Sequence, residues 1–230
     1  MFKSLLTSSL LFFSISVASA DTIAIVGTGD VAGALGPEFS ALGHTVVYGS
    51  REPDRDSARD LVERTGGDAR ATTPAESVID ADIVVLAVPG LIVGEIAESL
   101  GDLSGKIVID PTNPLDSGPN GELVHASESS NTAVIQAAQP DAYVVKAFNT
   151  LNWRTMIAPE SAGGPVSIPL AGNNVAAKER VAELCRGLGL DPIDLGGVDS
   201  ARWIEGMLIL WINNRYSDRE SFEFHLRRAN

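Results

Sequence analysis

The chain has 230 residues, enough for one large domain or for one domain with a small appendage. Hydrophobic residues make up 44% and charged residues 20%, so the composition predicts a packed core and argues against disorder. The formal net charge of −13 argues against a nucleic-acid partner, because such binding needs a basic surface. Cys185 is the only cysteine, so no disulfide can form within the chain. The three histidines lack metal-ligand spacing, and no metal site is expected.

Residues 1–20 have the three-part pattern of a cleaved secretory signal. Lys3 supplies a positive start, residues 5–17 are apolar and hydroxyl-rich, and Ala18-Ser19-Ala20 matches the A-x-A cleavage pattern. The apolar run is too short for a comfortable membrane span. We expect cleavage before Asp21 and a mature protein outside the cytoplasm. An uncleaved anchor and a misassigned start are the alternatives, and N-terminal sequencing of protein from native host fractions separates them.

The next segment is predicted to run strand, glycine turn, helix. Residues 22–26 form a short apolar, β-branched run that is typical of a buried parallel strand. The segment Gly27-Thr28-Gly29-Asp30-Val31-Ala32 then matches G-x-G-x-x-A. In this pattern the first glycine permits a tight turn, the second admits a pyrophosphate, and the small third residue lets the helix pack on the strand. The pattern predicts a dinucleotide site on the helix N-terminus; a glycine-rich turn without a ligand is the alternative.

The end of the second predicted strand, residues 45–48, indicates which dinucleotide is bound. An NAD site places Asp or Glu about 20 residues after the glycines, to bind the ribose 2′-OH. This chain has Ser50 and Arg51 there, with Arg55 one helical turn on. Hydroxyl and guanidinium donors suit a 2′-phosphate, so we predict NADP(H). The alternative is that both arginines are solvated charges among neighbouring acids.

The remaining elements alternate between helix and strand. Predicted helices cover residues 54–65, 91–100, 130–138, 175–188 and 200–213, and another begins at Thr73, Pro74 and Glu76 as N-cap, N1 and N3. Predicted strands cover residues 83–88, 106–110, 143–148, 165–171 and 191–195, and residues 115–122 and 156–164 are predicted loops. This alternation predicts an α/β, Rossmann-type, doubly wound and mostly parallel sheet. We divide it into a dinucleotide-binding domain, residues 21–150, and a short α/β extension, residues 151–230, that completes the substrate pocket. Residues 214–230 are polar and suit a surface tail or an oligomer contact, so a homodimer is possible.

Five motifs follow one another through residues 27–150: GTGDVAGALG, VVYGSR, VVLAVP, VIDPTNP and VKAFNT. The series resembles the F420-dependent NADP oxidoreductases and the related cytosolic reductase domain of the six-transmembrane (STEAP) metalloreductases. The resemblance extends over roughly residues 22–212, and VKAFNT is its most specific element. SARWIEGMLILW, at residues 200–211, resembles the closing helix of the family.

The resemblance implies four sets of contacts with the cofactor. Contacts with the pyrophosphate are implied for Thr28, Gly29, Asp30 and Val31, and contacts with the 2′-phosphate for Ser50, Arg51 and Arg55. Val88, Pro89 and Ile92 would line the adenosine or nicotinamide wall, and Ala147 and Asn149 would lie near the nicotinamide carboxamide. For Val88 and Ala147, simple core packing is the competing explanation.

The implied reaction is hydride transfer between NADP(H) and a flavin- or deazaflavin-like small molecule, with coenzyme F420 or a flavin as co-substrate. The protein then supplies proximity and orientation, and a flavin-like acceptor demands no general acid or base. We therefore assign no catalytic residue. His125 and Lys146 are the best titratable candidates, and Lys146, within a predicted strand, is expected to pair with a carboxylate.

Two other functions remain open from the residues alone. Pyrroline-5-carboxylate and 3-hydroxyacid type reductases share the Rossmann start, but they generally have a larger all-helical C-terminal domain than residues 151–230 can supply. A non-catalytic NADPH sensor would bind the cofactor without turnover. Cofactor oxidation by a panel of acceptors separates an enzyme from a sensor, whereas fold alone does not.

Overall fold

The computed structural model of this chain describes residues 20–218, 220 and 222–229. The predicted secretory signal, except for Ala20, therefore lies outside the described residues. Within the described part of the chain, no helix has both the length and the apolar character needed to cross a bilayer.

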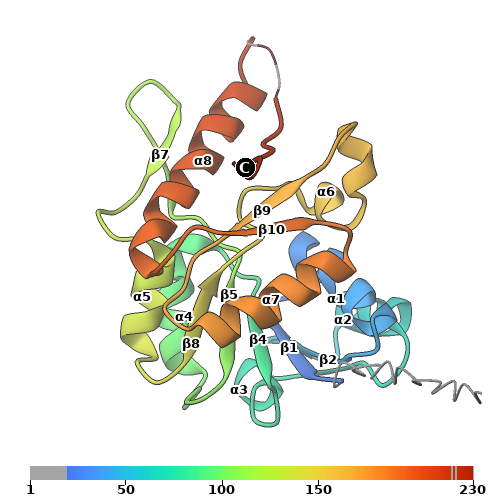
Figure 1. The fold of residues 1–230 in the computed structure, drawn as a ribbon. Helices are drawn as coiled ribbons and strands as arrows, with labels where there is room; N and C mark the ends of the chain where they lie inside the picture. The colour runs from blue at the N-terminus through green and yellow to red at the C-terminus, as the bar shows by residue number, and fades with distance from the viewer. Residues whose placement is uncertain (1–19, 219, 221, 230) are drawn as a thin grey trace, which may run out of the picture.

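Six parallel strands form the central sheet (Figure 1). Their spatial order is β3-β2-β1-β4-β5-β8, which reads 3-2-1-4-5-6 when the strands are numbered within the sheet. This is the order of the doubly wound dinucleotide-binding folds, so the predicted fold class is confirmed. In chain order the strands are β1 (Thr22–Val26), β2 (Thr45–Gly49), β3 (Arg70–Thr72), β4 (Ile83–Leu86), β5 (Ile107–Asp110) and β8 (Tyr143–Lys146).

Both faces of the sheet are covered, because successive side chains of a strand point to opposite sides. Ile23 and Ile25 pack on one face with α1 (Asp30–Ala41), α2 (Asp56–Thr65) and α7 (Val175–Gly187). Ala24 and Val26 pack on the other face with α4 and α5. The short α3 also lies at the sheet. These helices are α3 (Pro74–Ser77), α4 (Val93–Ser99) and α5 (Asn131–Ala138).

The extension is a second, smaller α/β unit. Strands β9 (Ser167–Leu170) and β10 (Asp191–Asp194) pair in parallel around α7, and the chain ends in α8 (Ala201–Arg215). A single antiparallel bridge between Lys146 and Ala171 joins this pair to the central sheet. One hydrophobic cluster includes both Ile25 and Ile168, so the core continues across residue 150. The division into two domains remains an interpretation of the sequence.

Five elements were not predicted, namely β3, β6, β7, α6 and η2. The predicted loop at residues 115–122 contains β6 (Leu115–Ser117), which forms a hairpin with β7 (Leu123–His125). The hairpin depends on a distant contact, because the Asn213 side chain on α8 donates to the Leu123 carbonyl and accepts from its N–H. The predicted loop at 156–164 overlaps α6 (Trp153–Ile157) and the 3-10 turn η2 (Pro159–Ala162). Edge strand β3 has only three residues, too few for a sequence pattern to show.

The polar C-terminal segment docks on the chain itself. Ser167 Oγ lies 2.9 Å from His225 Nδ1 and accepts from the Leu226 N–H at 2.9 Å. Arg228 forms an ion pair with Asp191 at 2.6 Å. The tail is thus attached to the β9–β10 pair, in line with the surface-tail interpretation (Figure 1).

The residue just before β1 is anchored to two distant side chains. Asp21 accepts from Arg180 of α7 at 2.5 Å, and the Asp21 N–H donates to His44 Nδ1 at 3.1 Å. The His44 side chain is only 7% exposed. Burial lowers the pKa of His44; Asp21 partly offsets this effect, and Arg180 lowers the pKa further.

This environment predicts a pH-dependent stability. The unfolded chain binds the His44 proton more readily than the folded chain, so the free energy of unfolding falls as pH drops below about 6.5, the pKa of an unperturbed histidine. We expect the wild type to lose more stability between about pH 7.5 and 5.5 than His44→Asn does, in urea denaturation. His225→Asn, at an exposed histidine, is the matched control and should follow the wild type. An equal loss in His44→Asn and the wild type would contradict the assignment.

Candidate dinucleotide site

A cleft of about 330 Å³ lies between the carboxyl ends of β1 and β4, where the strand order of the sheet reverses. Open α/β sheets bind their ligands at this position. The cleft is lined by Val26, Gly27, Thr28, Gly29, Gly49, Ser50, Arg51, Arg55, Pro74, Ala87, Val88, Pro89, Ile92 and Ile96.

The glycine turn has two distinct steric requirements. Gly27 has a φ of +113°, and a Cβ there would stand 2.1 Å from the Ala87 carbonyl oxygen, so the fold itself needs glycine. Gly29 has an ordinary φ of −85°, and no described atom lies within 4 Å of where its Cβ would stand. The space above Gly29 is therefore open. Gly29 is also the N-cap of α1, and no described side chain caps this helix. The first N–H groups of α1 remain available to an anion.

The far end of the cleft is polar and basic. Ser50 is buried, and its Oγ accepts from the Glu52 N–H at 3.2 Å. Arg51 and Arg55 are exposed, and the Arg55 guanidinium donates across the cleft to Thr28 Oγ1. None of the described residues that line the cleft is acidic. Positive charge is thus concentrated here in spite of the acidic composition of the chain.

The neighbouring acids do not neutralise these arginines. Within the described chain, no ion pair joins Arg51 or Arg55 to an acid, whereas Asp54 lies 3.8 Å from Arg59. Both arginines are exposed and free of such ion pairs, which fits a phosphate site and equally fits the alternative that they are solvated charges.

The opposite side of the cleft is apolar. We call Val88, Pro89, Ile92 and Ile96 the apolar wall; they follow β4 and continue through the 3-10 turn η1 (Gly90–Ile92) into α4. Pro74 also lines the cleft, and a capping box fixes it, as predicted. In that box Thr73 Oγ1 accepts from the Glu76 N–H, and Glu76 Oε2 accepts from the Thr73 N–H.

Two predicted pyrophosphate residues do not line the cleft. Asp30 is the first residue of α1, is exposed, and lines an adjoining hollow together with Arg64 and Trp153. Val31 is half-buried and packs against the hydrophobic core. The structure therefore brings together Thr28, Gly29, Ser50, Arg51, Arg55, Val88, Pro89 and Ile92, but not these two.

The turn after β8 holds the two predicted carboxamide residues, and it too lies outside the cleft lining. Ala147 is fully buried in the core. Asn149 is 3% exposed and exchanges hydrogen bonds with Asn113, at 2.9 and 3.1 Å. Asn149 Oδ1 is buried without a hydrogen-bond partner among the described residues. Phe148, between them, has a φ of +66°, which a non-glycine residue rarely adopts. Strain and an unpaired acceptor are features that cluster at functional sites.

Sequence reasoning missed a buried ionic group beside this turn. Lys146 pairs with Asp110 at 2.6 Å, so the expected carboxylate partner is confirmed, but it also pairs with Glu205 of α8 at 2.8 Å. The available signal was a single acid inside the apolar run WIEGMLILW, since acids are almost never fully buried unless paired. Cys185 is buried in α7, and burial raises the pKa of its thiol, which excludes it as a thiolate nucleophile.

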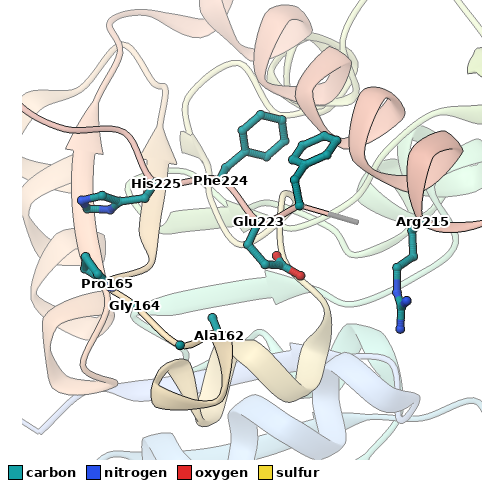
Figure 2. A pocket seen from close by; sticks show the side chains of 9 residues that line it. Ala162, Gly164, Pro165, Arg215, Glu223, Phe224 and His225 are labelled. Atoms are coloured by element: carbon teal, nitrogen blue, oxygen red, sulfur yellow. The ribbon is translucent and has the colours of Figure 1, made fainter. Parts of the chain in front are cut away.

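A second hollow, of about 470 Å³, lies between the loop before β9 and the C-terminal tail (Figure 2). Phe222 and Phe224 meet there edge to face, with ring centroids 5.1 Å apart. Arg215, at the end of α8, contributes from the other side (Figure 2). No predicted site residue lines this hollow.

The fold and the glycine-turn cleft define a Rossmann-type dinucleotide-binding protein. The family model described as NADP oxidoreductase, coenzyme F420-dependent, matches residues 22–114. The F420-dependent NADP reductase of Methanothermobacter thermautotrophicus is 30% identical over 212 residues, which cover 86% of this chain and 90% of that protein. A crystal structure described as a putative F420-dependent NADP reductase from Arthrobacter sp. FB24 is 32% identical, with a TM-score of 0.80, and the match covers 90% of this chain and 99% of that one.

The chain therefore belongs to the family of F420-dependent NADP oxidoreductases. Metalloreductase STEAP3 of Rattus norvegicus is 30% identical over 189 residues, which cover 82% of this chain but 36% of that protein. The chain thus spans about a third of the length of the metalloreductase that it matches. The resemblances to the F420-dependent NADP oxidoreductases and to the STEAP metalloreductases, both predicted from the motifs, are therefore confirmed.

The two glycines of the turn predict opposite mutant phenotypes. Gly27→Ala should lower the free energy of unfolding by about 2 kcal/mol or more, because of its φ and the Ala87 carbonyl. Gly29→Val should lose no more than about 1 kcal/mol of stability, yet it should abolish NADPH binding by filling the open space. Urea denaturation and calorimetric titration measure the two effects. Micromolar NADPH binding by Gly29→Val would place the cofactor elsewhere.

Proposed function

We propose that the cleft between β1 and β4 binds NADP(H), and that this chain transfers hydride between the nicotinamide and a flavin- or deazaflavin-like acceptor such as F420. One observation carries the cofactor assignment: the polar end of the cleft holds Ser50, Arg51 and Arg55 and has no acidic lining among the described residues. Guanidinium groups suit the 2′-phosphate that distinguishes NADP from NAD. The two F420-dependent NADP reductases to which the chain is similar support F420 as the acceptor.

The residues present fit a dinucleotide. The open space above Gly29 and the uncapped start of α1 suit the pyrophosphate. The apolar wall and Pro74 suit the flat adenosine half, and the unpaired Asn149 Oδ1 is an acceptor suited to the carboxamide N–H of the nicotinamide. We also propose that Asp30, Val31 and Ala147 lie close to the bound cofactor although they do not line the cleft. Asp30 and Val31 would lie beside the pyrophosphate, and Ala147 would lie beside the nicotinamide.

Hydride transfer asks the chain mainly for orientation. A reduced nicotinamide held by Gly29, Ser50 and the apolar wall would supply a hydride from its C4 atom to an acceptor ring placed against it. The protein residues hold the two rings together and exclude water from between them. This chemistry explains why no described acid–base pair lines the cleft.

Acceptor identity is tested by anaerobic NADPH oxidation with F420, FMN, FAD and ferric chelates supplied separately. Saturable reduction of F420 or a flavin supports the proposal. Reduction of ferric chelates alone would instead favour a metalloreductase-like activity, and NADPH binding without turnover on any acceptor would favour a sensor. The structure of residues 151–230 counts against a pyrroline-carboxylate type reductase, because they form an α/β unit rather than an all-helical domain.

We further propose that the mature protein begins at Asp21 and works outside the cytoplasm, on the strength of the leader pattern in residues 1–20. Its cofactor would then be loaded before export or supplied at the destination. An intact Met1 in the cytosolic fraction would overturn this proposal.

Arg51→Ala is expected to weaken NADPH binding by about 1.5–3 kcal/mol, the range for a hydrogen bond to a charged group. NADH binding should change little, because NADH lacks the 2′-phosphate. Arg59→Ala removes an exposed arginine of α2 that does not line the cleft and serves as the control. Calorimetric titration of both variants with both cofactors makes the measurement. An equal loss for NADPH and NADH in Arg51→Ala would remove the 2′-phosphate assignment.

A further inference from the structure

A buried ion cluster lies beside the candidate site and takes no part in the proposed hydride transfer. Asp110, Lys146 and Glu205 are each 0% exposed. The Lys146 ammonium pairs with both carboxylates and donates to the Thr112 carbonyl at 2.8 Å, so it has a partner for each of its three N–H groups. Burying such ions costs several kcal/mol for each, and apolar side chains often fill the same space with greater stability. Stability alone therefore does not explain the cluster.

His125 also contacts the cluster. Its Nε2 lies 2.8 Å from Glu205 Oε2, and its Nδ1 lies 2.6 Å from the Ser127 carbonyl oxygen. The Ser127 N–H approaches Nδ1 as well, at the longer distance of 3.4 Å. Glu205 therefore has a polar partner on each of its two carboxylate oxygens.

A chain of hydrogen bonds runs from this cluster to the cleft. Glu205 Oε1 accepts from the Asn131 N–H at 2.9 Å. The Asn131 side-chain amide donates to the Gly90 carbonyl at 3.0 Å and to Thr112 Oγ1 at 2.7 Å. Gly90 sits in the middle of the apolar wall, between Pro89 and Ile92. Glu205 thus binds the backbone N–H of Asn131, and the Asn131 side chain binds the backbone of the apolar wall at Gly90.

The backbone of the apolar wall at Gly90 lies very close to Asn113 and Asn131. A Cβ on Gly90 would stand 2.0 Å from the Asn113 carbonyl oxygen and 2.8 Å from Asn131 Nδ2. The backbone of η1 is therefore in close contact with the loop after β5 and with the start of α5.

We propose that Asn131 and Glu205 are positioning residues of the cofactor cleft, which set the apolar wall through Gly90. The proposal rests on the proposed function in that it takes the cleft to be the NADP(H) site. Neither residue lines the cleft, so their effect passes through the wall and not through the 2′-phosphate contacts. Their loss should weaken NADPH and NADH alike, unlike the loss of Arg51.

The test uses three variants of the full chain. Asn131→Ala removes both side-chain hydrogen bonds to Gly90 and Thr112 and should weaken NADPH and NADH by a similar factor, about tenfold, in KM more than in kcat. Glu205→Gln keeps an oxygen for the Asn131 N–H but removes the charge beside Lys146, so it should weaken NADPH and NADH alike, by less than Asn131→Ala does. Asn174→Ala is the control: it also deletes an asparagine that hydrogen-bonds to the backbone, but this one accepts from the Ala177 N–H at the start of α7.

A second measurement does not depend on activity. Amide hydrogen exchange of the cofactor-free protein should speed up at residues 88–96 in Asn131→Ala and stay at the wild-type rate there in Asn174→Ala. If the wild type itself fails to bind NADPH, the proposed function fails, while the exchange result still tests the positioning role. Unchanged exchange at residues 88–96, or a loss for NADPH alone, would overturn the positioning role.

Discussion

The buried ammonium group of Lys146 fixes the positions of the loop after β5 and of helix α8. An isolated cation at full burial would be strongly unfavourable, so each of its donors must meet an acceptor. Those acceptors come from three segments: Asp110 at the end of β5, the carbonyl of Thr112 in the loop that follows, and Glu205 of α8. The positions of that loop and of the last helix are thereby fixed relative to β8. Removing one partner of such a group leaves an uncompensated charge and typically costs about 3–5 kcal/mol.

The cleft obeys a different constraint, that of close backbone approach. Gly27 passes the Ala87 carbonyl, and Gly90 passes the Asn113 carbonyl, at distances that exclude any side chain. These two contacts draw the ends of β1, β4 and β5 together at the edge of the sheet. The cleft is thus bounded by rigid backbone, and its chemical character comes from a few side chains at its ends. Ser50 and Arg51 make one end of the cleft polar and basic, and the apolar wall makes the opposite side hydrophobic.

The parts of the site that could be predicted from sequence are those encoded within a few neighbouring residues. The glycine turn, the Ser50–Arg51 pair and the capping box at Thr73 each follow from a short motif with a steric or hydrogen-bonding reason. Glu205 could not be placed in this way, because only the folded chain brings it to Lys146, from which it is separated by 59 positions. The β6–β7 hairpin was missed for the same reason, since its polar strands rely on Asn213. The motif resemblance also implied Asp30, Val31, Ala147 and Asn149, and none of these four lines the cleft. A motif does not specify the direction of each side chain, and this direction decides whether a residue faces the cleft.

The pairing of Asp21 with Arg180 has a consequence for the timing of folding. The two residues stand 159 positions apart, and the helix that carries Arg180 also covers Ile23 and Ile25 of the first strand. Helices α1 and α2 cover the same face, so a chain leaving the ribosome lacks only the part of this cover that α7 supplies until the segment through residue 187 has been made. Burial of that face supplies much of the hydrophobic driving force, so the nascent protein stays short of its native state until late in synthesis. The order in which the chain is made leaves an interval in which a chaperone or a translocation machine can still bind it in unfolded form.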